Sequence, residues 1–191
     1  MAEKIYDKRV ERILMPGDFD FRNLTAEVRQ HMLAEIDQDI ADDVLVKSTR
    51  FTDEGVAGYP PLLRSAAHEH DEAWLAQCLL GSFNTTELSA GRLKAVPHHA
   101  HTLFAQSEFN RFYCRAVCLY ALANPDYIIR VYRARQSKNP RPESEAKLGK
   151  ILDATSVLKD LRNHLATDVE FGPNEIFSGL SLELVRNADT V

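Results

Sequence analysis

The sequence has few of the residues that build redox centres and phosphate-binding loops. Its 191 residues include three cysteines and eight glycines. Cys78, Cys114 and Cys118 form no Cys-x-x-Cys pair, and their odd number argues against a disulfide framework. The chain holds no P-loop, GxGxxG, GxSxG, kinase or EF-hand motif. These absences argue against an ordinary nucleotide-dependent enzyme and favour a reducing compartment.

Long apolar runs and an excess of basic residues are also missing. No apolar stretch approaches the roughly 20 residues that cross a bilayer. Lys and Arg total 23 against 28 Asp and Glu, which gives a formal net charge of −5. The chain as a whole is therefore not a basic nucleic-acid binder. With 45% hydrophobic and 27% charged residues, the composition predicts one soluble, intracellular globular domain with no membrane partner.

Two amphipathic helices stand out in what the sequence does contain. The first spans about residues 25–42, where Val28, Met32 and Ile36 recur every four residues behind the capping residue Thr25. The second spans about residues 107–123 and is apolar around most of its circumference. Its narrow polar strip predicts a helix at the centre of the fold. That strip is formed by Glu108, Arg111 and Arg115.

The remaining segments predict shorter elements. Residues 53–59 are expected to be a loop, and Pro60-Pro61 fits the start of a helix. A short helix follows over about residues 71–80, and residues 81–101 are irregular, with either a hairpin or an exposed excursion. A last helical region ends near residue 165. Strands are predicted over residues 44–51, 127–135 and 180–185.

The predicted fold class is α+β. We expect a single domain over residues 24–191, with five or six helices around a small mixed sheet. Residues 1–23 are expected to form an extended N-terminal arm, because Met15-Pro16-Gly17 breaks regular structure. Such an arm would lie along a neighbouring subunit, so a homo-oligomer is expected.

Closely spaced histidines make a candidate metal site. In an extended segment His99 and His101 point to the same side, where they could share a metal ion. The spacing matches no zinc signature, and exposed or partly packed histidines are the favoured interpretation. No cofactor is therefore expected.

A run of basic residues is the candidate contact surface for nucleic acid or for a partner. No acidic residue interrupts it, and Tyr132 lies within it. Basic strands beside aromatic residues can line a nucleic-acid groove. The same residues can form ion pairs within or between subunits, which we consider the better interpretation in an acidic protein. The run contains Arg130, Arg133, Arg135, Lys138 and Arg141.

Two weaker patterns favour structural interpretations. Asp126 followed by Glu145-Ala146-Lys147 imitates a nuclease metal motif, but Glu145 and Lys147 fall in a stretch predicted to be helical rather than extended. Cys114 and Cys118, four residues apart on the central helix, are predicted to be small buried hydrophobic residues.

Several segments of the C-terminal half resemble one family. They include the stretch from Glu108 to Cys118, Val131-Tyr-Arg-Ala-Arg and the following Asn139-Pro-Arg-Pro-Glu-Ser-Glu, with Ser178-Gly-Leu-Ser-Leu near the end. These segments are similar to an uncharacterised family found among bacterial phage and prophage genes. The resemblance implies a phage-related role and supplies no catalytic residue.

The function expected from these observations is a non-enzymatic structural protein of a phage particle. It would be a capsid accessory protein or a head-to-tail connector, with other virion proteins or copies of itself as partners. It would be assembled in the bacterial cytoplasm and located in the virion. Two alternatives stay open: a metal-dependent enzyme acting on nucleic acid, and a small DNA-binding protein that uses the basic strand.

Overall fold

The computed structural model describes residues 18–137, 139–163, 171–172, 176 and 178–187. Residues 1–17 of the predicted arm and Lys138 of the basic run lie outside this part of the chain. Among the described residues about 50% are helical and 16% are in strands. No helix among the described residues is long and apolar enough to cross a membrane.

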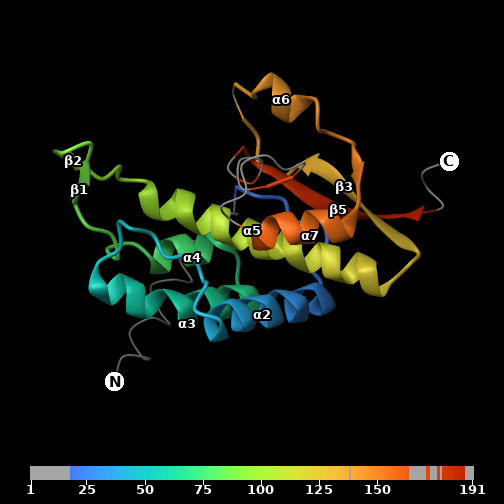
Figure 1. The fold of residues 1–191 in the computed structure, drawn as a ribbon, viewed down its shortest axis with the longest axis horizontal. Helices are drawn as coiled ribbons and strands as arrows, with labels where there is room; N and C mark the ends of the chain where they lie inside the picture. Colours follow the sequence, from blue (N-terminus) through green and yellow to red (C-terminus); the bar gives the residue numbers. More distant parts are fainter. Residues whose placement is uncertain (1–17, 138, 164–170, 173–175, 177, 188–191) are drawn as a thin grey trace.

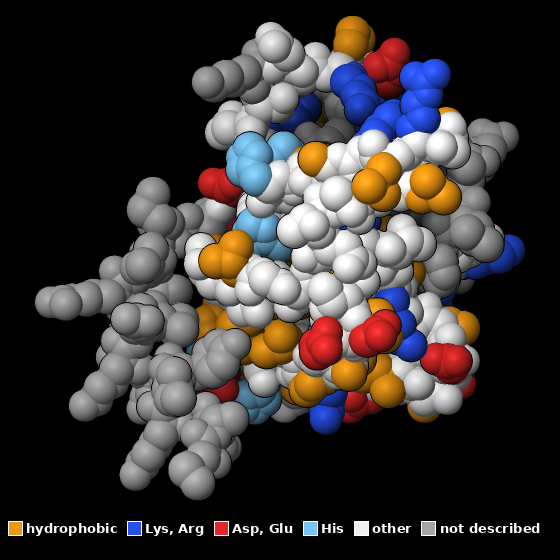
Figure 2. Space-filling view, turned by 90° about the vertical axis from the view of Figure 1, so that its left-hand side faces the viewer, with side chains coloured by type: hydrophobic (Ala, Val, Ile, Leu, Met, Phe, Trp, Pro, Cys, Tyr) orange, Lys and Arg blue, Asp and Glu red, His pale blue; other side chains and the backbone are white. Residues whose placement is uncertain are grey.

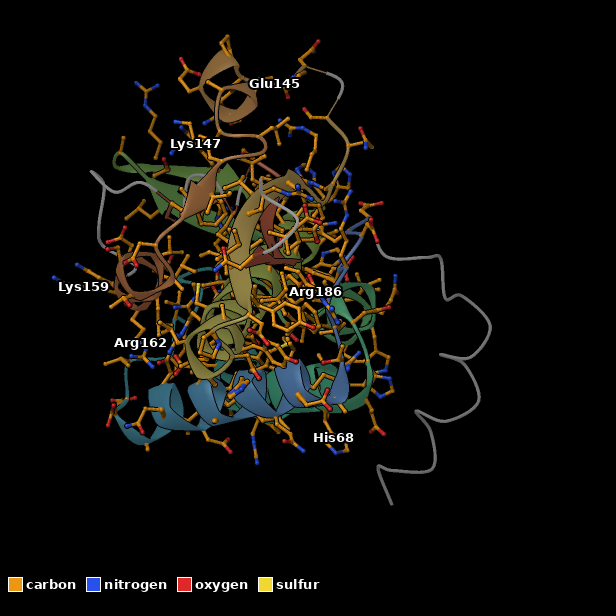
Figure 3. The ribbon with its side chains drawn as sticks, turned by 90° about the vertical axis from the view of Figure 1, so that its right-hand side faces the viewer. His68, Glu145, Lys147, Lys159, Arg162 and Arg186 are labelled. Atoms are coloured by element: carbon orange, nitrogen blue, oxygen red, sulfur yellow. The ribbon has the colours of Figure 1, made fainter. Side chains whose placement is uncertain are left out.

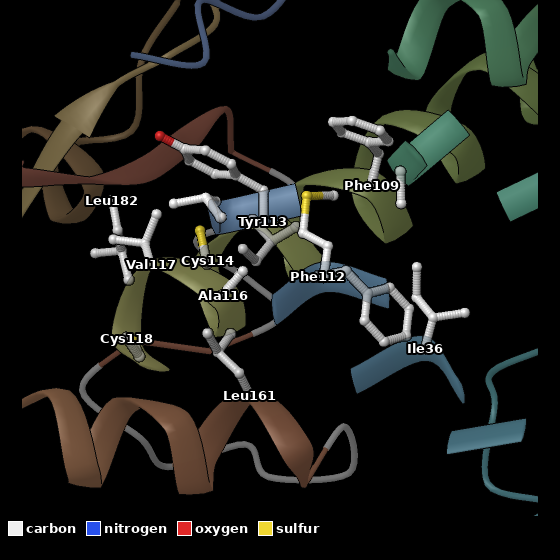
Figure 4. Packing of buried hydrophobic residues seen from close by; sticks show 14 of the residues in the cluster. Ile36, Phe109, Phe112, Tyr113, Cys114, Ala116, Val117, Cys118, Leu161 and Leu182 are labelled. Atoms are coloured by element: carbon white, nitrogen blue, oxygen red, sulfur yellow. The ribbon is translucent and has the colours of Figure 1, made fainter. Parts of the chain in front are cut away.

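Helix α5 (Ala100–Ala123) runs through the middle of the molecule and carries the core (Figure 1). It begins seven residues before the start predicted at Ser107, since the preceding residues continue the helix from His99. Its apolar residues are buried on nearly every side, and Figure 4 shows Phe112, Cys114 and Val117 packed among side chains of neighbouring elements. The prediction of a central helix is confirmed.

Three further helices pack against α5: α2 (Ala26–Ala41), α4 (Glu72–Cys78) and α7 (Ala154–Arg162). The predicted boundaries of α2 are confirmed, because the Thr25 side chain accepts a hydrogen bond from the Val28 N–H at 3.4 Å. The sequence periodicity correctly identified its buried face. That face includes Val28, Met32 and Ile36, each 0% exposed.

The loop predicted over residues 53–59 is wrong, because α3 (Asp53–Glu69) already begins there. The Thr52 side chain caps it by accepting from the Gly55 N–H at 3.0 Å, and both prolines lie inside the helix. Gly55 does not form a turn; the absence of a side chain at this position allows α3 to approach Ser82 closely. A Cβ at this position would lie 2.3 Å from the Ser82 carbonyl oxygen.

The strand predicted over residues 44–51 is also wrong. The chain leaves α2 through Asp43 in the left-handed region, with φ of 52°. The N–H groups of Val44 and Leu45 then both donate to the Asp39 carbonyl, at 2.9 and 3.1 Å. These donors close the end of α2 instead of joining a ladder. Only Phe51 forms an isolated bridge, to Phe83.

The main sheet packs on α5 and has the strand order β4 (Ile151–Leu152), β3 (Tyr127–Arg133), β5 (Leu180–Arg186). The strands predicted at 127–135 and 180–185 are thereby confirmed. The short helix α6 (Pro142–Glu145) projects beyond this sheet (Figure 1).

A separate hairpin, β1 (Thr86–Ser89) and β2 (Arg92–Ala95), projects from one end of the molecule (Figure 1). It lies in the stretch where the sequence predicted either a hairpin or an exposed excursion. The α+β class is confirmed, and both sheets among the described strands are antiparallel where a mixed sheet was expected.

Candidate functional site

The basic run predicted as a contact surface is divided among internal partners. The Arg130 Nε donates to Glu183 Oε1 at 2.8 Å, and the Arg130 side chain is 41% exposed. Arg133 donates to Glu145 Oε1 at 2.5 Å and to the Ser178 carbonyl at 3.2 Å. Both guanidinium groups therefore bind within the fold, as the ion-pair interpretation requires.

The other members of the run lie apart from this pair. Arg135 donates to the Gln106 side chain at 2.8 Å, and its guanidinium carbon lies 5.5 Å from the centre of the Phe19 ring. Arg141 is exposed at the start of α6. Lys138 is outside the described residues. The arrangement is a chain of local contacts rather than one continuous basic face.

The histidines do not have the extended geometry on which the metal prediction depended. His99 is the N-cap of α5 and His101 lies in its first turn. The His98 and His99 rings are 4.9 Å apart, and partial burial together with the neighbouring histidines lowers the pKa of His101. Among the described residues no group of three or more His, Cys, Asp or Glu side chains is placed to hold a metal ion.

The nuclease-like pattern is dispersed as well. Glu145 lies in α6 and pairs with Arg133, and Lys147 follows in the next turn. Figure 3 shows both at the α6 end of the molecule, far from His68. Asp126 precedes β3 and lines a small depression with Arg186.

An ion-pair network lies buried between α2, α5 and α7. The Arg115 guanidinium donates to both oxygens of Asp39, at 2.7 and 2.8 Å, and through Nε to Glu35 at 2.7 Å. Arg162 adds two hydrogen bonds to Glu35. Burial opposes the ionisation of Glu35, but the two arginines outweigh it and lower the pKa of this carboxyl.

The network continues along the polar strip of α5. Arg111 donates to Glu108 at 2.6 Å, and its guanidinium carbon lies 4.7 Å from the centre of the Phe112 ring. The Tyr59 hydroxyl reaches the same Glu108 carboxylate at 3.5 Å, and burial raises the pKa of Tyr59. Three carboxylates and three arginines thus meet between these helices, and the Nε and Nη1 atoms of the buried Arg111 have no hydrogen-bond partner among the described residues.

A cavity formed by described residues has a volume of about 380 Å³. We call it the aromatic cavity. It lies between residues 19–24 and the junction of α3 with α4. Its lining combines aromatic rings with several carboxylates. The lining residues are Phe19, Phe21, Leu24, Arg29, Glu69, His70, Asp71, Glu72 and Trp74.

Glu72 is the most buried carboxylate of the aromatic cavity, at 1% exposure. One of its oxygens accepts a hydrogen bond from the Phe19 N–H at 3.1 Å, which ties the N-terminal segment to α4. Burial raises the pKa of Glu72 to about 7, the Phe19 N–H opposes this rise, and the nearby Asp71 and Asp18 carboxylates add to it.

The hairpin presents its apolar face outward. Leu88 and Leu93 are directly opposite in the antiparallel register and are 76% and 72% exposed, the highest values among large apolar side chains in the described residues. The opposite face carries Glu87, which accepts two hydrogen bonds from Arg50, at 2.7 and 2.9 Å. This ion pair fixes the hairpin to the body of the protein. Figure 2 looks onto this end of the molecule.

Comparisons with protein-family models, with curated proteins and with solved structures gave no match to this chain. The sequence had indicated neither the aromatic cavity nor the outward face of the hairpin. An available signal was Leu88-Ser-Ala-Gly-Arg-Leu93, where two leucines flank a short turn in an otherwise polar stretch.

Proposed function

We propose that this protein is a non-enzymatic structural protein of a phage particle, either a capsid accessory protein or a head-to-tail connector, that works through contacts between copies of itself. The phage setting rests on the resemblance of segments in its C-terminal half to a phage and prophage family. The hairpin of β1 and β2, whose apolar face points away from the protein, supports the contact between copies and is the observation that carries the proposal.

A two-stranded hairpin normally turns its apolar residues toward the protein and its polar residues toward water. Here Glu87 is held against the body by Arg50, and Leu88 and Leu93 face away from it. An isolated hairpin is only marginally stable, and exposed cross-strand leucines add nothing to its stability in water. The arrangement becomes favourable when another apolar surface covers the two leucines.

A second copy of the chain is the partner that this hairpin fits. Among the described strands, β1 and β2 pair with each other and with no third strand, so their outer backbone edges are available for further pairing. Two hairpins related by a two-fold axis bring their leucine faces together, and the same patch then serves both subunits.

The test is the mass of the protein in solution, measured by size-exclusion chromatography with light scattering over about a hundredfold range of concentration. The wild-type chain is expected to form a discrete multimer. The double variant Leu88→Ser/Leu93→Ser is expected to dissociate at concentrations at least about tenfold higher than those at which the wild type does, because it removes two large apolar side chains from the interface.

A matched control is the double variant Leu122→Ser/Ile151→Ser. These side chains are 47% and 51% exposed and lie outside the hairpin, so their replacement should leave the multimer unchanged. A wild-type protein that stays monomeric at every concentration, or a control that dissociates as readily as the hairpin variant, contradicts the proposal. Circular dichroism confirms that each variant keeps its fold.

A further inference from the structure

We propose that the aromatic cavity is a binding site for an organic cation, an alkylammonium or guanidinium group carried on a short apolar stem. This site is separate from the hairpin, and the inference does not depend on the proposed assembly. Three properties of the described residues lead to it: the rings that line the cavity, its excess of carboxylates, and one carboxylate that has no counter-ion.

The aromatic rings of the lining form two stacked pairs, and His70 and Trp74 are only partly buried. Phe19 and Phe21 are stacked with ring centres 5.3 Å apart, and His70 and Trp74 are stacked at 4.1 Å with an interplanar angle of 13°. The face of an aromatic ring attracts a cation, and tryptophan does so most strongly. A volume of about 380 Å³ falls within the range of small-ligand sites and is large enough for a group of this size.

The charge of the cavity is negative. Glu69, Asp71 and Glu72 line it. Arg29 is the only Lys or Arg among the lining residues, and its guanidinium is already occupied. It donates to three carbonyls at the C-terminal end of α3, at 3.2, 2.8 and 2.8 Å. These carbonyls are neutral and leave the charge of Arg29 in place, so the lining carries three carboxylates against one guanidinium.

Glu72 distinguishes this cavity from a surface cluster of acids. It is 1% exposed, and none of the described residues forms an ion pair with it. The buried carboxylates of the ion-pair network, by contrast, each have an arginine within 2.8 Å. A buried carboxylate without a counter-ion is unfavourable, and a cation bound in the cavity would supply the missing charge.

Trp74 is the only tryptophan of the chain, so its fluorescence reports on this cavity alone. The first experiment titrates the protein at about pH 8 with n-butylguanidinium, and separately with N-acetyl-arginine amide, while Trp74 emission is recorded. Both cations should give a saturable change. N-butylurea, which has a similar shape and no charge, should give none, because the carboxylates select for charge.

The two cations distinguish the possible sources of the bound group. Tighter binding of N-acetyl-arginine amide indicates a basic side chain presented by another protein segment. Tighter binding of n-butylguanidinium indicates a free small cation. Either order supports a cation site.

The variant Glu72→Gln should weaken binding of n-butylguanidinium at least about tenfold, and Glu69→Gln should weaken it less because Glu69 is 63% exposed. The matched control is Glu143→Gln, which removes an exposed carboxylate from α6 and should leave binding unchanged. Unfolding curves for each variant establish that the fold is intact, and Glu69→Gln keeps the test decisive if Glu72→Gln is poorly folded.

Binding should also weaken at about pH 5.5, because Glu72 becomes protonated there. The charged groups that face it are Asp18, Asp71, Glu69 and Arg29. The His70 ring lies in the same cavity. Any pH dependence of cation binding that remains in the variant Glu72→Gln is therefore caused by ionisable groups other than Glu72. No saturable change at about pH 8, an equal response to N-butylurea, or unchanged affinity in both Glu72→Gln and Glu69→Gln overturns the proposal.

Discussion

The carboxyl of Glu72 makes the stability of the fold depend on pH. Its pKa of about 7 lies above the ordinary value of 4.5 for a glutamate because the group is buried. Below about pH 4.5 the folded and unfolded chains both hold the proton, and this carboxyl favours neither. Between about pH 4.5 and 7 the unfolded chain releases the proton more readily. Stability is therefore lost as the pH rises through this range.

The variant Glu72→Gln should remove this loss. We expect its free energy of unfolding to match that of the wild type near pH 4.5 and to exceed it at pH 8 by at most about 3 kcal/mol. The glutamine carbonyl still accepts from the Phe19 N–H. Urea unfolding at both pH values measures the difference. A variant that is less stable than the wild type at pH 8 would show that the ionised carboxylate stabilises the fold.

The burial of Glu72 could not be read from the sequence. Asp71-Glu72-Ala73-Trp74 has the pattern of an ordinary helix N-terminus, where acids face solvent and favour the helix dipole. Burial results from residues 19–24, which lie more than 45 positions away and fold across this turn. A contact between residues this far apart in the sequence cannot be detected from the local spacing of residue types.

At the scale of elements, the polar strip of α5 determines how the helices assemble. Arg115 joins two carboxylates of α2 to the centre of α5. Replacing it by methionine leaves the buried Asp39 with Arg111, at 3.9 Å, as its one remaining ion-pair partner among the described residues. We expect Arg115→Met to lower the free energy of unfolding by about 3–5 kcal/mol, because it leaves a buried charge without its partner.

The control for this prediction is Arg162→Met. Arg162 contacts the same Glu35, but its side chain is 49% exposed, so we expect a loss of about 1 kcal/mol or less. Chemical unfolding of the two variants at neutral pH provides the comparison. Equal losses would mean that burial does not set the strength of this network.

The spacing of residues correctly predicted the helices and strands that are determined by local sequence signals rather than by contacts with distant residues. Thr25 and the four-residue repeat of α2 are local signals, and so are the β-branched and aromatic residues of β3. The start of α3 was missed because Gly55 and Gly58 are typical of loops. Gly55 instead allows the helix to approach the Ser82 carbonyl. This requirement appears only once the two segments are packed.

At the scale of the whole molecule, long-range pairing determines what the candidate residues do. The sequence identified the arginines of β3 but not their partners, because Glu145 lies 12 positions away and Glu183 and Ser178 lie 45 or more positions away, all beyond the range of local spacing. The candidate metal site required an extended segment, and the histidines lie instead at a helix start. Composition and spacing identify chemically capable residues, whereas the topology determines which of them meet.

The pairing of these arginines leads to a prediction about DNA. Glu183 is bound by Arg130 and by Arg22, each at 2.8 Å, and the protein carries a net charge of −5. An arginine that neutralises a phosphate must first release its carboxylate. We therefore expect no strong salt-dependent binding of duplex DNA by the wild-type protein, measured as fluorescence anisotropy of a labelled duplex between about 50 and 200 mM salt.

The variant Glu183→Gln tests the physical reason. It frees both arginines without adding a basic residue, so any weak affinity for the duplex should increase and its salt dependence should steepen by about one to two phosphate contacts. A wild-type protein that already binds with a steep salt dependence, lost in Arg130→Gln/Arg133→Gln, would contradict this expectation. It would show that the ion pairs of β3 open readily and that the strand contacts nucleic acid.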